Sequence, residues 1–490
     1  MPRVIIRGER YDINKWTFLT IFITIFLFSF GGIILDFFAS TSLGLMVWTF
    51  KDYSELPPTE LEYFGPEQQI FGDDEDVKPF KIKIPESQLI ILKEKLSNTR
   101  ELNPPFMGVG FKYGCNSEYL KSFLEFWKTK YNWKNREDYL NSFPQFTTQI
   151  AGLNIHFIHS KPNKAKARGK EILPMLLIHG WPGSLRGLYN LIPLLTTPME
   201  SHNFVFEIIA PSVPGNGFSD APQVPGLDAA KIAIIFDKLM LRLGFRKYFI
   251  HAADTGALIG QSQAILFPQR VLGYHSNMCI SVSWYSIIYM YLAVRIPAVF
   301  QDHGKRGVIP KNFWILNAES GFFHFSARNP DTLGVMMSDS PAGLAANVLD
   351  KFTSWSNFNR RLSEDGGLRA FDKYDLLDII TIHWLTNSVT SSLRMWKETF
   401  RFYSFFMKNG IMMREVKVPS GCVWFKNEAA FMPLWVLKQV FPKLVSLNYL
   451  RDGGHFPALE KPLDLSDDIW EFVKIARFVA ERDKRLKTEL

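Results

Sequence analysis

Residues 248–260 read YFIHAADTGALIG, and this stretch decides the fold. It joins a short apolar run to a helical pattern through a turn of small residues. A nucleophile on a sharp strand-to-helix turn needs small residues two positions before it and two positions after it, because larger side chains would clash there. Ala252 and Gly256 meet this requirement around Asp254. Aspartate is also a good helix N-cap, so this stretch alone leaves both interpretations open.

Short apolar runs alternate with helical stretches on both sides of this turn. We expect strands at 173–178, 204–209, 248–251, 271–274, 416–425 and 445–450, and helices at 87–96, 119–131, 231–243, 258–267 and 467–481. Buried strands that alternate with helices predict a parallel sheet covered on both faces. Residues 280–400 are helical and aromatic in pattern, which predicts an inserted lid. Upstream, residues 148–160 predict a hairpin that turns at Ala151 and Gly152.

Two glycine-rich loops follow other predicted strands. Residues 179–184 read HGWPGS, and backbone N–H groups in such a loop can point toward a developing negative charge. Residues 452–457 read DGGHFP and place His455 after the last predicted strand. Each loop alone fits an ordinary turn, and a lone histidine is more often structural. In the α/β-hydrolase fold, the catalytic residues follow the chain order nucleophile, acid, histidine. Asp254 at the nucleophile position and His455 much later in the chain fit the first and last places of this order. The two motifs therefore predict an α/β-hydrolase fold.

The N-terminal segment 16–35 contains no charged residue and reads WTFLTIFITIFLFSFGGIIL. A helix of about 20 apolar residues spans a bilayer, whereas the apolar part of a signal peptide has only ~7–15 residues. We therefore expect one N-terminal transmembrane helix. Its orientation stays open, because basic residues before the segment favour a lumenal main domain. The small number of cysteines and the lack of an Asn-x-Ser/Thr site favour a reducing compartment instead.

The composition excludes several classes of protein. Hydrophobic residues make up 47% of the 490 residues, and the formal net charge is +8. We find no stripe of Lys and Arg interleaved with aromatic residues, so nucleic-acid binding is not expected, and a basic surface near an anionic membrane fits better. The cysteines lie far apart without metal-ligand spacing, which predicts neither a disulfide framework nor a metal site; they are Cys115, Cys279 and Cys422.

Four motifs give the chain a family resemblance. They are HGWP at 179–182, PSVPGNGFS at 211–219, DSPAGLA at 339–345 and GGHF at 453–456. With them, the chain resembles the microsomal and juvenile-hormone epoxide hydrolase family over nearly its whole length. The resemblance implies a membrane anchor (1–50), a linker with the N-terminal epoxide-hydrolase extension (51–160), an α/β-hydrolase core (161–280 and 401–490) and a helical lid (281–400).

By this resemblance Asp254 is the nucleophile, which attacks an epoxide carbon and forms an ester. His455 then activates a water that hydrolyses the ester, and Glu428 orients His455. Backbone N–H groups near Trp181 and Thr255 stabilise the oxyanion. The implied substrates are a small lipophilic epoxide and water, with no metal or cofactor. The implied location is the endoplasmic reticulum (microsomal) membrane, with the main domain on the cytosolic side. The sequence gives no indication of the oligomeric state.

The chain departs from the family pattern in the lid. The family opens the epoxide with two lid tyrosines that donate protons to the leaving oxygen, and here Phe322 and His383 stand at these positions. Loss of general-acid assistance costs about 10²–10⁴ in rate. We expect an epoxide hydrolase and keep two alternatives. One is a weak or inactive relative that binds a lipophilic ligand, and the other is a different hydrolase, such as a dehalogenase, with the same Asp, His and Glu.

A tyrosine at position 383 tests the lid assignment. If His383 occupies the proton-donor position, His383→Tyr raises the rate of diol formation, because an imidazole must be protonated to act as an acid. The conversion of styrene oxide to its diol measures this rate. An unchanged or lower rate in a folded variant contradicts the assignment.

Overall fold

A computed structural model describes residues 3–6, 9–12, 56–66, 72–281, 320–400 and 410–489. The chain divides into two compact units, residues 1–55 and 56–490. The described part of the first unit is an antiparallel pair of strands, β1 (Arg3–Ile6) and β2 (Glu9–Asp12). The predicted membrane-spanning segment 16–35 lies outside the described residues. Within the described ranges, no helix is both long enough and apolar enough to cross a membrane.

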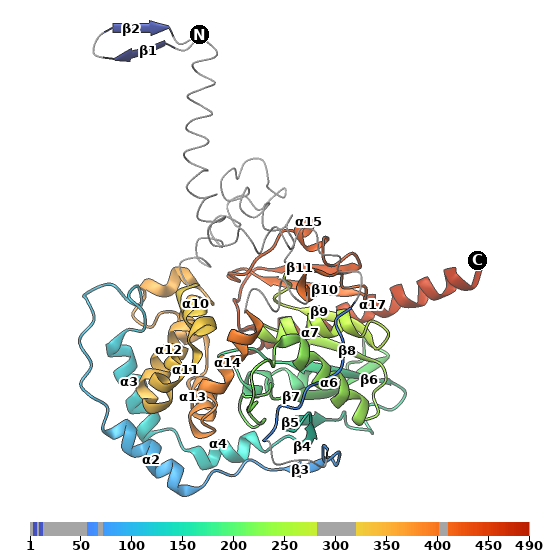
Figure 1. Cartoon of the computed structure of the whole chain (residues 1–490), viewed down its shortest axis with the longest axis horizontal. Helices are drawn as coiled ribbons and strands as arrows, with labels where there is room; N and C mark the ends of the chain where they lie inside the picture. The colour runs from blue at the N-terminus through green and yellow to red at the C-terminus, as the bar shows by residue number, and fades with distance from the viewer. Residues whose placement is uncertain are drawn as a thin grey trace. The chain divides into compact units, whose positions relative to one another are not determined.

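The second unit is built on a nine-stranded sheet with the order β11-β10-β9-β8-β6-β7-β5-β4-β3 (Figure 1). Its strands are β3 (Lys78–Phe80), β4 (Gln145–Ile150), β5 (Leu153–Ser160), β6 (Glu171–Ile178), β7 (Phe204–Pro211), β8 (Tyr248–Ala252), β9 (Val271–Ser276), β10 (Ser420–Phe425) and β11 (Leu444–Leu450). The strands from β6 to β11 are parallel, and β3, β4 and β5 extend the sheet in antiparallel fashion. The predicted parallel sheet is therefore confirmed.

The predicted hairpin is also present, between β4 and β5. Its two turn residues, Ala151 and Gly152, have φ of 55° and 79°, as the common two-residue hairpin turn requires. Both turn amides donate hydrogen bonds to the carboxylate of Asp73, at 2.7 and 2.6 Å. These bonds hold a non-glycine residue in the left-handed region.

Helices cover both faces of the sheet, because each central strand is apolar on both sides. In β6, Met175 and Leu177 point into one core, whereas Leu176 and Ile178 point into the other, as the alternation of side chains along a strand dictates. The helices outside the lid are α2 (Glu86–Ser97), α3 (Ser117–Thr129), α4 (Trp133–Leu140), α5 (Ile192–Thr196), α6 (Ala229–Arg242), α7 (Thr255–Leu266), α15 (Leu434–Leu437), α16 (Pro457–Glu460) and α17 (Pro462–Glu489).

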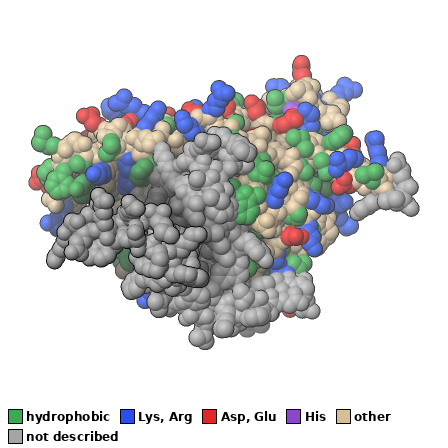
Figure 2. Space-filling view, turned by 90° about the horizontal axis from the view of Figure 1, so that it is seen from above, with side chains coloured by type: hydrophobic (Ala, Val, Ile, Leu, Met, Phe, Trp, Pro, Cys, Tyr) green, Lys and Arg blue, Asp and Glu red, His purple; other side chains and the backbone are tan. Residues whose placement is uncertain are grey.

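The described surface carries charges of both signs. In the view of Figure 2, Lys and Arg side chains are interspersed with Asp and Glu side chains and with hydrophobic ones.

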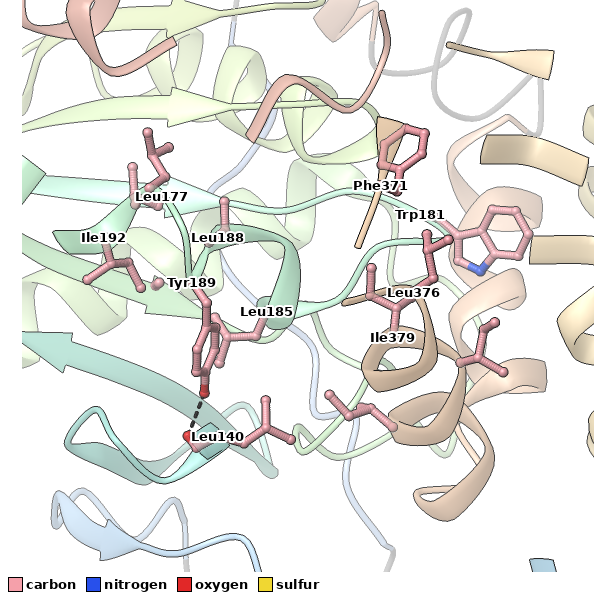
Figure 3. Close-up of a cluster of buried hydrophobic side chains, with 14 of the residues drawn as sticks. Leu140, Leu177, Trp181, Leu185, Leu188, Tyr189, Ile192, Phe371, Leu376 and Ile379 are labelled. Carbon is pink, nitrogen blue, oxygen red and sulfur yellow. Dashed lines mark hydrogen bonds between the residues drawn. The ribbon is translucent and has the colours of Figure 1, made fainter. Parts of the chain in front are cut away.

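Five described α-helices lie between β9 and β10 and form the inserted lid. They are α10 (Ser320–Arg328), α11 (Pro330–Asp339), α12 (Pro341–Ser354), α13 (Lys373–Leu385) and α14 (Val389–Thr399). Figure 3 shows how this insertion joins the core: Leu376 and Ile379 of α13 pack near Trp181 and Leu185, in the loop that follows β6. Lid and sheet therefore share one continuous hydrophobic core.

A buried ionic cluster reinforces this junction. Asp378 of α13 is fully buried and accepts hydrogen bonds from Arg186, Arg136 and Tyr131, each 2.8 Å long. Arg186 also contacts Asp375 on the same helix. The cluster therefore links three parts of the chain, since Arg186 follows β6, Asp378 belongs to the lid, and Arg136 and Tyr131 belong to the N-terminal extension.

Cys279 and Cys422 form a disulfide, contrary to the sequence-based expectation. In the register of β9 and β10, Cys422 lies opposite Ser276, and Cys279 follows Ser276 by three residues. The two cysteines are 143 positions apart in sequence, but their Cα atoms are 5.9 Å apart, within the usual range for a disulfide. The expectation was wrong because spacing along the chain does not reveal which strands are neighbours in the sheet.

The buried cluster predicts a large difference between two arginine substitutions. Arg186→Met leaves the carboxylate of Asp378 with one cation fewer in a buried site, and loss of one partner of a buried ion pair costs about 3–5 kcal/mol. The matched control Arg394→Met breaks the exposed pair with Asp331, 2.8 Å long, and costs no more than about 1 kcal/mol. Denaturant unfolding measures both. Equal losses would contradict a special role for the cluster.

Candidate active site

The turn at Asp254 joins β8 to α7 with a strained backbone. Asp254 has φ 52° and ψ −131°, a region that non-glycine residues rarely adopt and that costs about 1–3 kcal/mol. A Cβ atom at Gly256 would come within 2.4 Å of the carbonyl oxygen of His179. The small residue predicted at this position is therefore required by the close approach of the loop that follows β6.

The carboxylate of Asp254 does not cap helix α7. Its Oδ1 accepts a hydrogen bond from the backbone N–H of Trp181, at 2.7 Å. Its Oδ2 lies 3.1 Å from Nε2 of His455. Gly180 leaves the space that this arrangement needs, because a Cβ atom there would lie 2.3 Å from Cβ of Asp254. The alternative N-cap interpretation is thus excluded, and Asp254 faces a hydrogen-bond donor and a histidine.

Glu428 and His455 complete a buried chain of hydrogen bonds. Glu428 follows β10 and His455 follows β11, so neighbouring strands deliver both residues to the same edge of the sheet. Nδ1 of His455 lies 2.9 Å from Oε2 of Glu428. The backbone N–H of His455 donates to the carbonyl oxygen of Trp355, 3.1 Å away, which ties the histidine loop to the lid. The predicted set of Asp254, His455 and Glu428 therefore comes together.

Two carboxylates determine the charge of His455. Burial alone would lower the pKa of His455, but Glu428 on one side and Asp254 on the other raise it to about 10. At neutral pH the ring is therefore an imidazolium that donates to both carboxylates. Neutralising either carboxylate would lower this pKa.

A cavity of about 450 Å³ opens above these residues, a size typical of small-molecule sites. Asp254, Glu428 and His455 contribute to its wall, and Thr255 lies beside them. Most of the other described lining residues are apolar, among them Leu258, Phe323, Trp355, Trp396, Phe400 and Phe431. The cavity therefore combines a reactive carboxylate with surroundings that suit a lipophilic compound. Within the described ranges, no group of His, Cys, Asp and Glu is arranged to hold a metal ion.

The two lid positions singled out in the sequence lie outside the described lining of this cavity. Phe322 on α10 stacks on Trp181, with ring centroids 4.7 Å apart and planes at 19°. Its helix neighbours Phe323 and His324 line the cavity instead. Sequence reasoning missed these two residues, although both belong to the segment in which it sought the tyrosine. The signal that could have found them is the helical periodicity around position 322.

The geometry does not support the proton-donor role predicted for His383. Nε2 of His383 lies 2.9 Å from the carbonyl oxygen of Pro182, and Nδ1 lies 3.3 Å from Oγ of Ser388. Burial lowers the pKa of His383, so the ring is neutral at neutral pH. These contacts indicate that His383 supports the loop that carries Trp181, because both ring nitrogens already have partners.

Comparisons with known proteins agree with this site. Residues 77–187 match the family described as epoxide hydrolase N terminus, and residues 174–286 match the α/β hydrolase fold family. Together, the fold and the site define an α/β hydrolase with an aspartate, Asp254, on the turn between β8 and α7.

Individual relatives identify the family within this class. The chain is 39% identical to juvenile hormone epoxide hydrolase of Bombyx mori, over 92% of this chain and 97% of the relative. It is also 39% identical to epoxide hydrolase 1 of Oryctolagus cuniculus, over 90% and 98% of the two chains. The crystal structure of the Bombyx mori enzyme matches with a TM-score of 0.82 at 40% identity, covering 86% of this chain and 100% of that one. The chain belongs to the microsomal and juvenile-hormone epoxide hydrolase family.

The raised pKa of His455 predicts how the site titrates. We expect the labelled ring of His455 to stay protonated at pH 8 in an NMR titration, because its pKa is about 10. Asp254→Asn removes one of the two carboxylate charges, so the midpoint moves to lower pH. A wild-type midpoint near the usual value of about 6.5 would contradict this electrostatic picture.

The same shift makes stability depend on pH. The folded-state pKa lies above the unfolded value of about 6.5, so the contribution of the His455 ion pairs is fully present below that pH and is lost as pH rises through about 10. The difference in unfolding free energy between the wild type and His455→Gln therefore shrinks over this interval.

Proposed function

We propose that the protein hydrolyses lipophilic epoxides to vicinal diols through an ester on Asp254. The observation that carries this proposal is the placement of the Asp254 carboxylate, which lies between the Trp181 amide and His455 on the wall of an apolar cavity. The names of the close relatives support the same reaction.

The first step forms a covalent bond between enzyme and substrate. Oδ2 of Asp254 attacks an epoxide carbon, and the bond between that carbon and the epoxide oxygen breaks. A carboxylate suits this reaction because the resulting alkyl ester can be hydrolysed, whereas a serine nucleophile would form a stable ether. Asp254 therefore favours epoxides or alkyl halides over carboxylic esters as substrates.

His455 supplies the proton that the opened epoxide needs. In the resting site it is an imidazolium, 3.1 Å from Oδ2 of Asp254. Formation of the ester removes the charge of Asp254, which lowers the pKa of His455 and favours transfer of its proton to the new alkoxide. The histidine is then neutral and can act as a base.

The second step regenerates the carboxylate. Neutral His455 takes a proton from water as the water oxygen attacks Cγ of Asp254. The charge that develops on Oδ1 is stabilised by the N–H of Trp181, which already lies 2.7 Å from this oxygen, and by the N–H of Thr255. Collapse of the intermediate breaks the bond from Cγ to Oδ2. The leaving oxygen takes a proton from His455, and the carboxylic acid that forms protonates His455 again, so the imidazolium and carboxylate of the resting site are restored.

One observation supports the alternative of a weak or inactive relative that binds a lipophilic ligand. Phe322 has no hydroxyl group and stacks on Trp181, and His383 is directed at the carbonyl of Pro182. Neither of these two described residues is placed to donate a proton to the substrate, so the proposed epoxide opening uses the proton of His455. Turnover would then fall by as much as the 10²–10⁴ that such assistance supplies.

We further propose that residues 16–35 anchor the protein in the membrane of the endoplasmic reticulum, where lipophilic epoxides dissolve. The length and apolar character of the segment support this. Disulfides persist in oxidising compartments, so the bond between Cys279 and Cys422 supports a lumenal main domain over the cytosolic one that the family resemblance implies.

A single-turnover reaction in water labelled with heavy oxygen tests the ester mechanism. With enzyme in excess over styrene oxide, the first diol receives its new oxygen from Asp254 and is unlabelled, while the label enters the carboxylate of Asp254. Mass spectrometry of the diol and of the peptide that contains Asp254 measures both.

Asp254→Ala is the control, and it forms no diol above the uncatalysed rate. Wild-type protein that forms no more diol than Asp254→Ala would favour the ligand-binding alternative. Label that appears only in the first-turnover diol would instead indicate direct attack by water.

A further inference from the structure

A small chamber lies beneath the nucleophile, separate from the substrate cavity. Its volume is about 60 Å³, several times the ~10–15 Å³ that one water molecule needs. Asp254 and His455 line both the chamber and the larger cavity, so these two residues form the boundary between them. Water in the chamber would contact both groups that the second step requires.

A buried asparagine, Asn277, lies in the wall of this chamber. It follows β9, is 1% exposed, and contributes to the chamber wall. Neither its Oδ1 nor its Nδ2 has a hydrogen-bond partner in the described part of the chain. A buried polar group that stays unpaired costs about 1–3 kcal/mol. The amide of Asn277 therefore destabilises the folded protein unless it binds something in the chamber. An amide offers both a donor and an acceptor to water.

His251 adds a second acceptor, whose tautomer is fixed by a chain of hydrogen bonds. Nε2 of His275 lies 2.8 Å from Oδ2 of Asp468, and because a carboxylate accepts, His275 donates through Nε2. With His275 in its neutral form, its Nδ1 is an acceptor, and Nδ1 of His251, 2.9 Å away, donates to it. Burial and His275 hold the pKa of His251 well below its usual value. His251 therefore lines the chamber as a neutral ring with Nε2 as an acceptor.

We infer that the chamber holds the water that hydrolyses the aspartyl ester, and that Asn277 and His251 are positioning residues that orient it. This inference rests on the proposed function. One hydrogen of the water faces Nε2 of His455, the other faces Oδ1 of Asn277 or Nε2 of His251, and an oxygen lone pair is left to face Cγ of Asp254. As the new C–O bond forms, the water proton moves to His455 and the carbonyl electron pair moves to Oδ1 of Asp254.

Single-turnover kinetics separate this role from a structural one. Styrene oxide is mixed with excess enzyme, and intact-protein mass spectrometry follows formation and decay of the ester. In Asn277→Leu we expect ester formation within about twofold of wild type and ester decay slowed at least about tenfold, which corresponds to about 1.4 kcal/mol. The melting temperature should not fall, because the variant removes an amide without protein partners.

Two further variants keep the result interpretable. Asn347→Leu makes the same change on lid helix α12 and serves as the matched control. Oδ1 of Asn347 is also buried without a partner in the described residues, but Asn347 lies outside the chamber. The rates of ester formation and ester decay should both stay at the wild-type level in this variant. His251→Phe removes the second acceptor and should also slow decay alone, whereas His251→Gln, which retains an acceptor, should recover part of the loss.

The possible failures are distinct. If the wild type forms ester and folded Asn277→Leu hydrolyses it at the wild-type rate, the assignment of the water site is wrong. Equal slowing of both steps would also overturn it, because that pattern indicates general damage to the site. If no ester forms in the wild type, the proposed function is wrong and the inference falls with it.

Discussion

The site depends on the strained turn at Asp254. With a positive φ at this residue, the chain leaves β8 and enters α7 within two positions, and the carboxylate projects beyond the end of the sheet. Regular backbone would turn the side chain elsewhere. The strain is sustained because β8 is paired with β9 over its whole length and with β6 from Phe249 to Ala252, and because the following helix is buried. Two glycines, at positions 180 and 256, let the neighbouring loop approach closely enough to present its amide.

The charged groups of the active site stabilise one another. Two carboxylates surround one imidazolium, so the resting site holds one net negative charge in a buried position. Isolated buried ions are unfavourable, and the hydrogen bonds of His455 to the two carboxylates stabilise these three buried charges. Alkylation of the nucleophile changes this balance without any movement of the protein. In the proposed mechanism the same histidine can therefore be an acid in one step and a base in the next.

Local patterns in the sequence predicted much of this structure. Strands, helices and the hairpin follow from periodicity, and the turn at Asp254 follows from Ala252 and Gly256. Asp254 and His455 were predicted because each follows a predicted strand, whereas Glu428 was placed only by the family resemblance. Contacts between distant segments were not predictable in this way. The family resemblance assigned Phe322 and His383 to the lid tyrosine positions, and only the packing of the lid shows that one stacks on Trp181 and the other bonds to Pro182.

The polar groups beneath the nucleophile illustrate the same limit. Asn277 and His251 looked like ordinary residues at strand ends. What sets them apart is their hydrogen bonding in three dimensions: Asn277 lacks a partner among the described residues, and His251 bonds to His275. A hydrogen-bond chain that begins at Asp468, near the C-terminal end of the sequence, fixes the tautomer of a ring just before the nucleophile. The periodicity of the sequence does not predict a chain of hydrogen bonds between segments so far apart.

The disulfide between Cys279 and Cys422 closes the inserted lid into a covalent ring. A ring of 143 residues reduces the entropy of the unfolded chain by an amount equivalent to roughly 5 kcal/mol in the chain-entropy estimate. The bond joins the point where the chain leaves β9 to the strand that leads to Glu428. The two ends of the lid therefore stay covalently joined unless the bond is first reduced. Any opening of the lid must instead occur as motion within the ring, while its two ends remain fixed to the sheet.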